Sequence, residues 1–202
     1  DRTLCGRYAY CWPRDAVFIT KAMDILNMDK ETEKFYKIFC KKTQSKNGMW
    51  EQRFYTDCKL APAWGYQVDE TASVIYGVYE HYLETKNEKF LKDTLPMCEK
   101  AISFLKHYVK DWLDLDAEEI LNKDKVKEEM EEQLRKNGKE RKIHVSYDLW
   151  EMCEGIHLYS LATIYSAFTT ILKIYKVLGK NVSDFDNNRL KEEKVQKNEK
   201  EI

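Results

Sequence analysis

The apolar residues of this chain recur at helical spacing almost from end to end, and only seven glycines and three prolines interrupt the pattern. Residues 16–26 are apolar on most faces, as in a helix buried at the centre of a fold. Residues 30–42 instead carry one apolar stripe, formed by Phe35, Ile38 and Phe39, against a charged face, which is typical of an outer helix. The pattern predicts an all-α fold that begins with an inner helix and continues with an outer one.

The same pair recurs further along the chain. Residues 69–83 have the inner character, and residues 88–109 are amphipathic, with Pro96 suited to the first turn of a second helical part. Residues 157–178 are again of the inner type and stop at Gly179, a residue type favoured after helix C-termini. Such an order builds either a double-layered helical toroid or an α-solenoid, and periodicity does not distinguish the two.

The charge balance argues against several classes of partner. With 34 basic and 35 acidic residues, the net charge is −1, which gives no overall field to attract nucleic acid or an anionic membrane. No apolar run approaches the ~20 residues of a membrane span, and no signal-like segment opens the chain. We therefore expect a soluble, cytoplasmic protein.

The six cysteines form no C-x-x-C pair and lie mostly within apolar or aromatic stretches. Buried thiols in a reduced, intracellular chain are the preferred interpretation, although an even count also allows disulfides. Cys153 has no basic neighbour in the sequence to activate it as a nucleophile, and the histidines suggest no metal cluster. We expect neither a metal nor a cofactor.

Each segment that leads into an inner helix ends in aromatic and acidic residues. The three segments are residues 8–15 (YAYCWPRD), 63–70 (AWGYQVDE) and 147–155 (YDLWEMCEG). If the inner helices run parallel, the segments gather at one end of the fold, where tryptophans stack on sugar rings and polar side chains, Gln67 and Asp69 among them, bind hydroxyls. The alternatives are core packing of each tryptophan and N-capping by each carboxylate, and capping is about as plausible for the third segment taken alone. The coincidence of all three favours a sugar-binding cleft.

The same residues resemble the motifs of a known family. Y-x-Y-x-W-x-R-D at 8–15, W-G-x-Q-x-D at 64–69 and Y-D-L-W-E at 147–151 are similar, in the same order, to the first motifs of glycoside hydrolase family 15, the glucoamylases and their glucodextranase and trehalase relatives. The resemblance runs from about residue 5 to residue 178. It implies an (α/α)6 barrel with its active site where the inner helices begin. It also implies inverting hydrolysis of α-linked glucose polymers or oligosaccharides from the non-reducing end.

The resemblance further implies roles for individual residues. Glu151 matches the general acid, and Asp148 is a neighbouring carboxylate that would help keep Glu151 protonated. Arg14 and Asp15 match the pair that hydrogen-bonds the terminal glucose. The other matched substrate-binding positions are Tyr8, Trp12, Trp64, Leu149 and Trp150. Fungal relatives carry a second glutamate where this chain has Met152, so that position carries over no role, and Glu154 is only a weak substitute.

The resemblance covers about half of such a barrel. An inverting glycosidase needs a second carboxylate about 6.5–9.5 Å from the acid to activate water, and in this family that base belongs to the second half of the barrel. We therefore expect residues 1–180 to form a partial barrel with a charged helical insertion at about 114–142, followed by a polar tail at 181–202. Such a fragment is expected to lack glucosidase activity and to self-associate through its open apolar flanks.

Two functions of other classes are the alternatives. One is a carbohydrate-binding module or degenerate enzyme, and the other is an all-α interaction scaffold whose aromatic loops belong to the core. Binding of maltose or an iminosugar separates the scaffold from the rest, because a scaffold binds neither.

Overall fold

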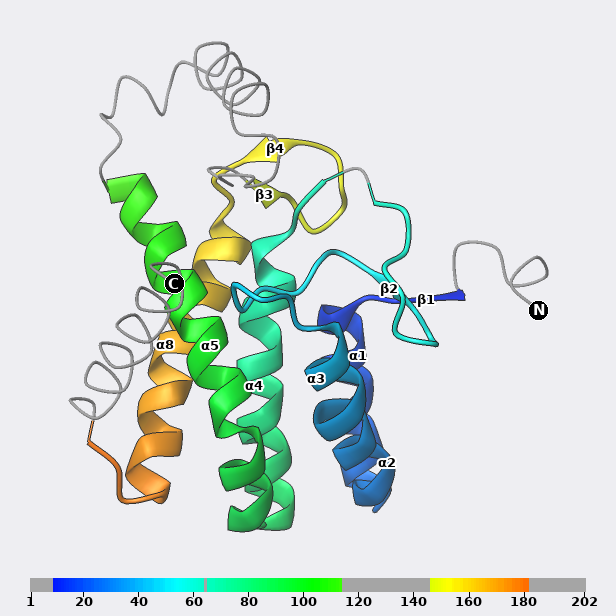
Figure 1. The fold of residues 1–202 in the computed structure, drawn as a ribbon, viewed down its shortest axis with the longest axis vertical. Coiled ribbons are helices and arrows are strands. Elements are labelled where there is room, and N and C mark those ends of the chain that lie inside the picture. Colours follow the sequence, from blue (N-terminus) through cyan, green and yellow to red (C-terminus); the bar gives the residue numbers. More distant parts are fainter. Residues whose placement is uncertain (1–8, 64, 114–145, 182–202) are drawn as a thin grey trace, which may run out of the picture.

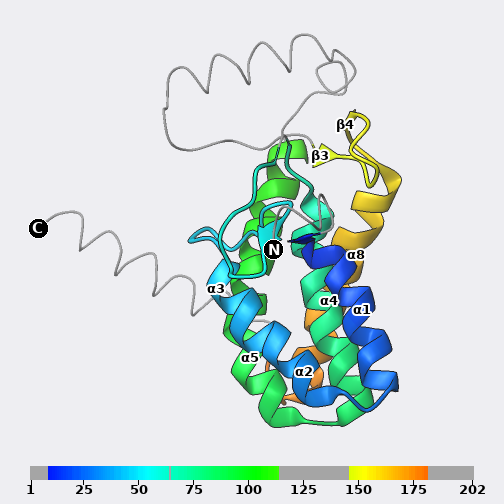
Figure 2. The ribbon, with the colours of Figure 1, turned by 90° about the vertical axis from the view of Figure 1, so that its right-hand side faces the viewer.

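The computed structural model describes residues 9–63, 65–113 and 146–181 of the chain. In this part the chain is mostly helical, and the helices form two layers (Figures 1 and 2). The inner layer holds α1 (Pro13–Ile25), α4 (Val68–Thr85) and α8 (Leu158–Val177). The outer layer holds α5 (Glu88–Leu113) and one helical stretch composed of α2 (Asp29–Lys34), the π-helix η2 (Phe35–Cys40) and α3 (Lys41–Thr43). The prediction of an all-α fold is confirmed for the described residues.

The three inner helices run side by side in the same direction. The central helix, α4, packs between α1 and α8, and in Figure 1 all three run downward from their first turns. The segments that lead into them therefore meet at the end where these helices begin. Tyr8, Trp64, the expected insertion at 114–142 and the tail from residue 182 onward lie outside the described residues.

The core sits between the two layers. Val74, Ile75 and Val78 of α4 are fully buried, as are Phe90 and Leu105 of α5. Burial of each such side chain stabilises the fold by about 1.5–3 kcal/mol. This core packs α4 against α5 beneath the loops.

Close helix packing depends on Gly77. A Cβ atom at this position would lie 2.2 Å from the Tyr36 hydroxyl oxygen and 2.8 Å from Val17 Cγ1. The absence of a side chain at Gly77 therefore lets α1 and η2 approach α4.

The outer helices differ from the predicted ones in two details. Tyr36 and Cys40, rather than Ile38, are the buried residues of the first outer stretch, because π-turns contain more residues than α-turns and shift the positions that face the core. Pro96 lies inside α5, which continues as one helix through it. The proline is exposed, so water can satisfy the carbonyl group that loses its N–H partner there.

The outward faces of α1 and α8 are apolar and exposed. In α1, Phe18 is 57% exposed and Ile25 is 65% exposed. In α8, Leu158 is 82% exposed and Tyr165 is 72% exposed. Open apolar flanks are what we expect of a partial barrel, and α1 has one because it packs on one side against the other described helices.

The buried side of α1 is partly polar. Thr20 shares a hydrogen bond of 2.9 Å with the Tyr36 hydroxyl, and Asp24 accepts from Nδ1 of the buried His81 at 2.9 Å. These pairs satisfy polar groups that would otherwise be costly to bury.

Short strands that periodicity did not predict order the loops above the helices. β1 (Tyr10–Cys11) pairs with β2 (Phe54–Tyr55), and β3 (Ser146–Tyr147) pairs with β4 (Glu154–Gly155), both in antiparallel fashion. None of the described helices combines the length and the hydropathy that a membrane crossing requires.

The cysteines of the described chain are free thiols. Cys40 and Cys98 are buried as expected, and burial raises the pKa of Cys98 to about 12. Cys11 and Cys58 are partly buried and Cys153 is exposed, so the expectation of buried thiols holds for only some of them.

Candidate functional site

A buried group of charges joins the beginnings of α1 and α4. An Arg14 guanidinium nitrogen lies 2.7 Å from an Asp69 carboxylate oxygen and 3.1 Å from Glu70 Oε1. The backbone N–H of Arg14 donates to Glu70 Oε2 at 2.6 Å. Pro13 opens α1 and has no N–H, so Glu70 satisfies the first free N–H of the helix. Arg14 is 5% exposed, and Asp69 and Glu70 are fully enclosed.

The electrostatics of this group are those of two carboxylates that share one cation. Burial raises the pKa of Asp69, and it raises the pKa of Glu70 well above its usual value, although Arg14 opposes both shifts. Asp69 Oδ1 and Glu70 Oε1 have no hydrogen-bond partner among the described residues. Glu70 Oε1 is within ion-pair distance of Arg14 but receives no aligned N–H. Tyr159, in the first turn of α8, is close enough that burial and then Asp69 raise the pKa of its phenol.

Asp15 is the exposed member of the pair predicted to bind glucose. Its side chain is 59% exposed, while its carboxylate lies 3.3 Å from the Arg14 guanidinium. Gln67 and Asp69, which the sequence suggested as further hydroxyl-binding groups, are instead fully buried. Their polar atoms connect the three segments to one another, so in this structure they do not offer groups at the surface.

Trp12 belongs to an aromatic group around Arg53. Its ring is in edge contact with Tyr10 at 5.9 Å between centroids. The Arg53 guanidinium lies 5.6 Å from the Trp12 ring and 5.1 Å from the Tyr10 ring, and Arg53 Nε donates to the Pro62 carbonyl at 2.7 Å. These cation–π contacts hold the end of the first segment against the loop that precedes the second. Sequence reasoning missed Arg53, because an isolated arginine between Gln52 and Phe54 carries no local signal of a site.

The second segment borders a hollow at the same end of the fold. Its volume is about 550 Å³, and its wall is lined by Glu51, Tyr55, Leu60, Ala61, Pro62, Ala63 and Gly65. That volume is within the range of small-molecule sites, about 300–1,000 Å³. Glu51 and Tyr55 were not predicted as site residues.

The β3–β4 hairpin is docked onto the beginning of α4. The Tyr147 N–H donates to the Tyr66 carbonyl at 2.8 Å, the Val68 N–H donates to Ser146 Oγ at 3.0 Å, and Gln67 Nε2 donates to the Asp148 carbonyl at 2.7 Å. The second and third segments therefore meet as the sequence predicted.

Gly65 allows the closest approach in this docking. A Cβ atom at that position would lie 2.1 Å from Cδ2 of the Tyr147 ring. Only glycine leaves room for the ring.

The turn between β3 and β4 is organised around Asp148. Its carboxylate accepts the backbone N–H groups of Trp150, Met152 and Cys153 at 3.0, 2.7 and 2.8 Å. These bonds, led by that from Cys153, lower the pKa of Asp148. The charge of Asp148 is thus stabilised by the turn itself. The effect of Asp148 on Glu151 stays a prediction.

Glu151 sits at the tip of this turn in a left-handed conformation. Its φ is 60°, and its N–H donates to the Asp148 carbonyl at 2.9 Å. A non-glycine residue pays on the order of 1–2 kcal/mol for this conformation, which is often retained at functional sites. The neighbouring Trp150 is 79% exposed, and Leu149 is partly buried.

The capping interpretation of the third segment is wrong. The first turn of α8 contains no acidic residue, and its N-cap is His157, which makes no side-chain capping bond. Asp15, Asp69 and Glu70, in contrast, do lie in first turns of helices, so capping describes the first two segments better than the third.

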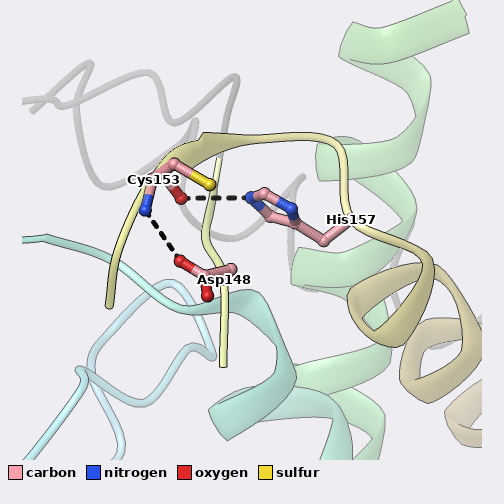
Figure 3. A group of neighbouring side chains, drawn as sticks. All are labelled: Asp148, Cys153 and His157. Carbon is pink, nitrogen blue, oxygen red and sulfur yellow. Dashed lines mark hydrogen bonds between the residues drawn. The ribbon is translucent and has the colours of Figure 1, made fainter. Parts of the chain in front are cut away.

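The structure also brings together three side chains that the sequence did not suggest as a group. Asp148, Cys153 and His157 each place one potential ligand atom within 4.8 Å of the others. Figure 3 shows them around the β3–β4 turn. The expectation of no metal cluster had rested on the histidines, which are scattered in sequence.

Comparison with known proteins gives one distant match. An uncharacterized glycosyl hydrolase of Methanocaldococcus jannaschii is 22% identical over 173 residues, which cover 86% of this chain and 23% of that protein. The chain thus spans about a quarter of its relative's length. No family model matches the chain, and no solved structure matches it significantly.

Proposed function

We propose that this chain is the acid-bearing part of a glycoside hydrolase catalytic domain that removes glucose from α-linked polymers or oligosaccharides with inversion, as family 15 glucoamylases do. The observation that carries the proposal is the meeting of the three motif segments. Arg14 contacts Asp69 across 55 positions, and Gln67 contacts Asp148 across 81. The distant similarity to a protein named a glycosyl hydrolase supports the same reaction class.

In the proposed mechanism Glu151 gives its proton to the glycosidic oxygen as the bond from that oxygen to the anomeric carbon breaks. Water attacks the opposite face of the sugar and loses a proton to a second carboxylate contributed by a further part of the catalytic domain. The exposed Trp150 offers a stacking face to the sugar ring, and Asp15 offers an acceptor to its hydroxyls. The proposed substrate-binding set is completed by Tyr8, Trp12, Arg14, Trp64, Asp148 and Leu149.

The exposed faces of α1 and α8 support the proposed (α/α)6 toroid. Both flanks of the inner layer are apolar and exposed. Exposed apolar patches of this kind normally bind a partner. We propose that the remaining helices of the toroid cover them in the complete protein. When residues 1–202 are isolated, the same faces are expected to drive self-association.

The proposal is tested on the complete protein by measuring glucose release from maltose and starch, with NMR to identify the anomer first formed. We expect β-glucose. Calorimetric titration with a glucose-like iminosugar distinguishes the two alternatives, a carbohydrate-binding module and a helical scaffold. Binding without turnover would assign a carbohydrate-binding module instead, and the absence of both would assign a helical scaffold.

A further inference from the structure

We propose that the turn between β3 and β4, together with the start of α8, binds a divalent zinc-type metal ion through Asp148, Cys153 and His157. The three potential ligand atoms lie within 4.8 Å of one another. In Figure 3 the edge of the imidazole ring that carries Nε2 faces Cys153 and Asp148. This site shares Asp148 with the predicted sugar-binding residues, but it does not depend on the proposed chemistry of Glu151.

The donor set selects the class of ion. A thiolate, an imidazole and a carboxylate together are ligands of Zn²⁺ and of similar transition metals, whereas Mg²⁺ and Ca²⁺ prefer oxygen alone. Three protein ligands leave the fourth tetrahedral position to water.

The geometry requires only small movements. Tetrahedral zinc with its usual bond lengths places ligand atoms about 3.3–3.8 Å apart, so the three side chains would close by roughly an ångström. Cys153 is exposed, and rotation of its side chain moves no core group.

The Asp148 carboxylate is held in place before any ion binds. Oδ1 accepts two backbone N–H groups, from Met152 and Cys153, whereas Oδ2 accepts that of Trp150 alone among the described residues. Oδ2 therefore keeps a lone pair for a metal ion. The backbone bonds fix the carboxylate much as outer partners fix the ligands of known metal sites.

His157 is turned toward the same point by a hydrogen bond. Its Nε2–H donates to the Cys153 carbonyl at 3.1 Å. Coordination through Nε2 would replace this bond and move the ring proton to Nδ1. A bound ion would then tie Asp148, at one end of the turn, to the start of α8, and so brace the turn that presents Trp150 and Glu151.

The test uses Co²⁺ as a spectroscopic probe of the reduced protein. We expect one equivalent to bind with a thiolate-to-cobalt charge-transfer band and Zn²⁺ to displace it. Cys153→Ser should abolish the band, and Cys153→Ser or His157→Gln should weaken Zn²⁺ binding by at least about 100-fold, since even outer-partner losses cost 10–100-fold. Cys58→Ser, which changes another free thiol, should bind as the wild type does.

Circular dichroism of each variant distinguishes a lost ligand from a lost fold. The proposal is overturned if Co²⁺ gives no thiolate band with folded wild-type protein. It is equally overturned if folded Cys153→Ser and His157→Gln proteins bind Zn²⁺ as tightly as the Cys58→Ser control.

Discussion

Replacement of Gly65 by alanine should disturb the docking of the hairpin that carries Glu151. The added Cβ would lie 2.1 Å from Cδ2 and 2.3 Å from Cε2 of the Tyr147 ring. The backbone of Tyr147 is held by the bond from its N–H to the Tyr66 carbonyl at 2.8 Å. Either the Tyr147 ring must leave its position against Gly65, or the hairpin or the loop that enters α4 must shift.

Overpacking of this kind costs about 1–3 kcal/mol. For a protein of this size each kcal/mol lowers the midpoint of thermal unfolding by about 2–4 °C. We therefore expect a loss of roughly 2–12 °C, measured by circular dichroism, together with weaker iminosugar binding in the complete protein.

Gly155→Ala is the matched control on the same hairpin. Its Cβ would lie 3.4 Å from His157 Cε1, an ordinary contact, so little change is expected. Combining Gly65→Ala with Tyr147→Ala should cost less than the sum of the two single changes, because the clash is then absent. If Gly65→Ala were as stable as Gly155→Ala, or if its cost were unchanged by loss of the Tyr147 ring, the described docking would be wrong.

Three further predictions concern the buried charges, the helix packing and the apolar flanks. Burial raises the pKa of Glu70 in the folded state well above 4.5. The stability that this shift contributes is fully present below the pKa of the unfolded state and is lost as pH rises through the pKa of the folded state. Glu70→Gln should therefore reduce the loss of unfolding free energy between about pH 5 and about pH 8, measured by urea unfolding at both values. Gly77→Ala should destabilise the fold by about 1–3 kcal/mol, measured as the shift of the urea midpoint, since its Cβ would lie 2.2 Å from the Tyr36 hydroxyl oxygen. The double substitution Leu158→Lys and Tyr165→Lys should reduce self-association of the isolated chain, measured by light scattering. It should change the stability by no more than about 0.5 kcal/mol per site, because these side chains are 82% and 72% exposed. An unchanged particle size would exclude α8 as the associating surface.

Local patterns predicted the helices well because each inner and outer helix has its own periodicity. The predicted stop at Gly179 is an example, since that glycine has a φ of 64° and follows the end of α8. The π-helix at 35–40 was missed because no residue there marks it.

The contacts of the site were harder to predict because they join distant positions. The sequence suggested Arg14 as a sugar-binding residue, which stays a prediction, but it did not suggest the ion pairs of Arg14 with Asp69 and Glu70 from α4. Those two carboxylates are consecutive in the sequence, and only the side-by-side packing of α1 and α4 brings them to Arg14. The grouping of Asp148, Cys153 and His157 similarly depends on how the β3–β4 turn folds back on itself.

The central claim, that Glu151 is the general acid, is tested most directly by the kinetics of Glu151→Gln in the complete protein on two substrates. Glutamine keeps the shape of the side chain but carries no acidic proton, so kcat/KM on maltose should fall by about 10²–10⁴-fold. Activity on α-glucosyl fluoride should fall far less, because fluoride departs without full protonation, and Glu154→Gln should leave both activities near wild type. Wild-type turnover of maltose by Glu151→Gln, or an equal loss on both substrates, would contradict the assignment.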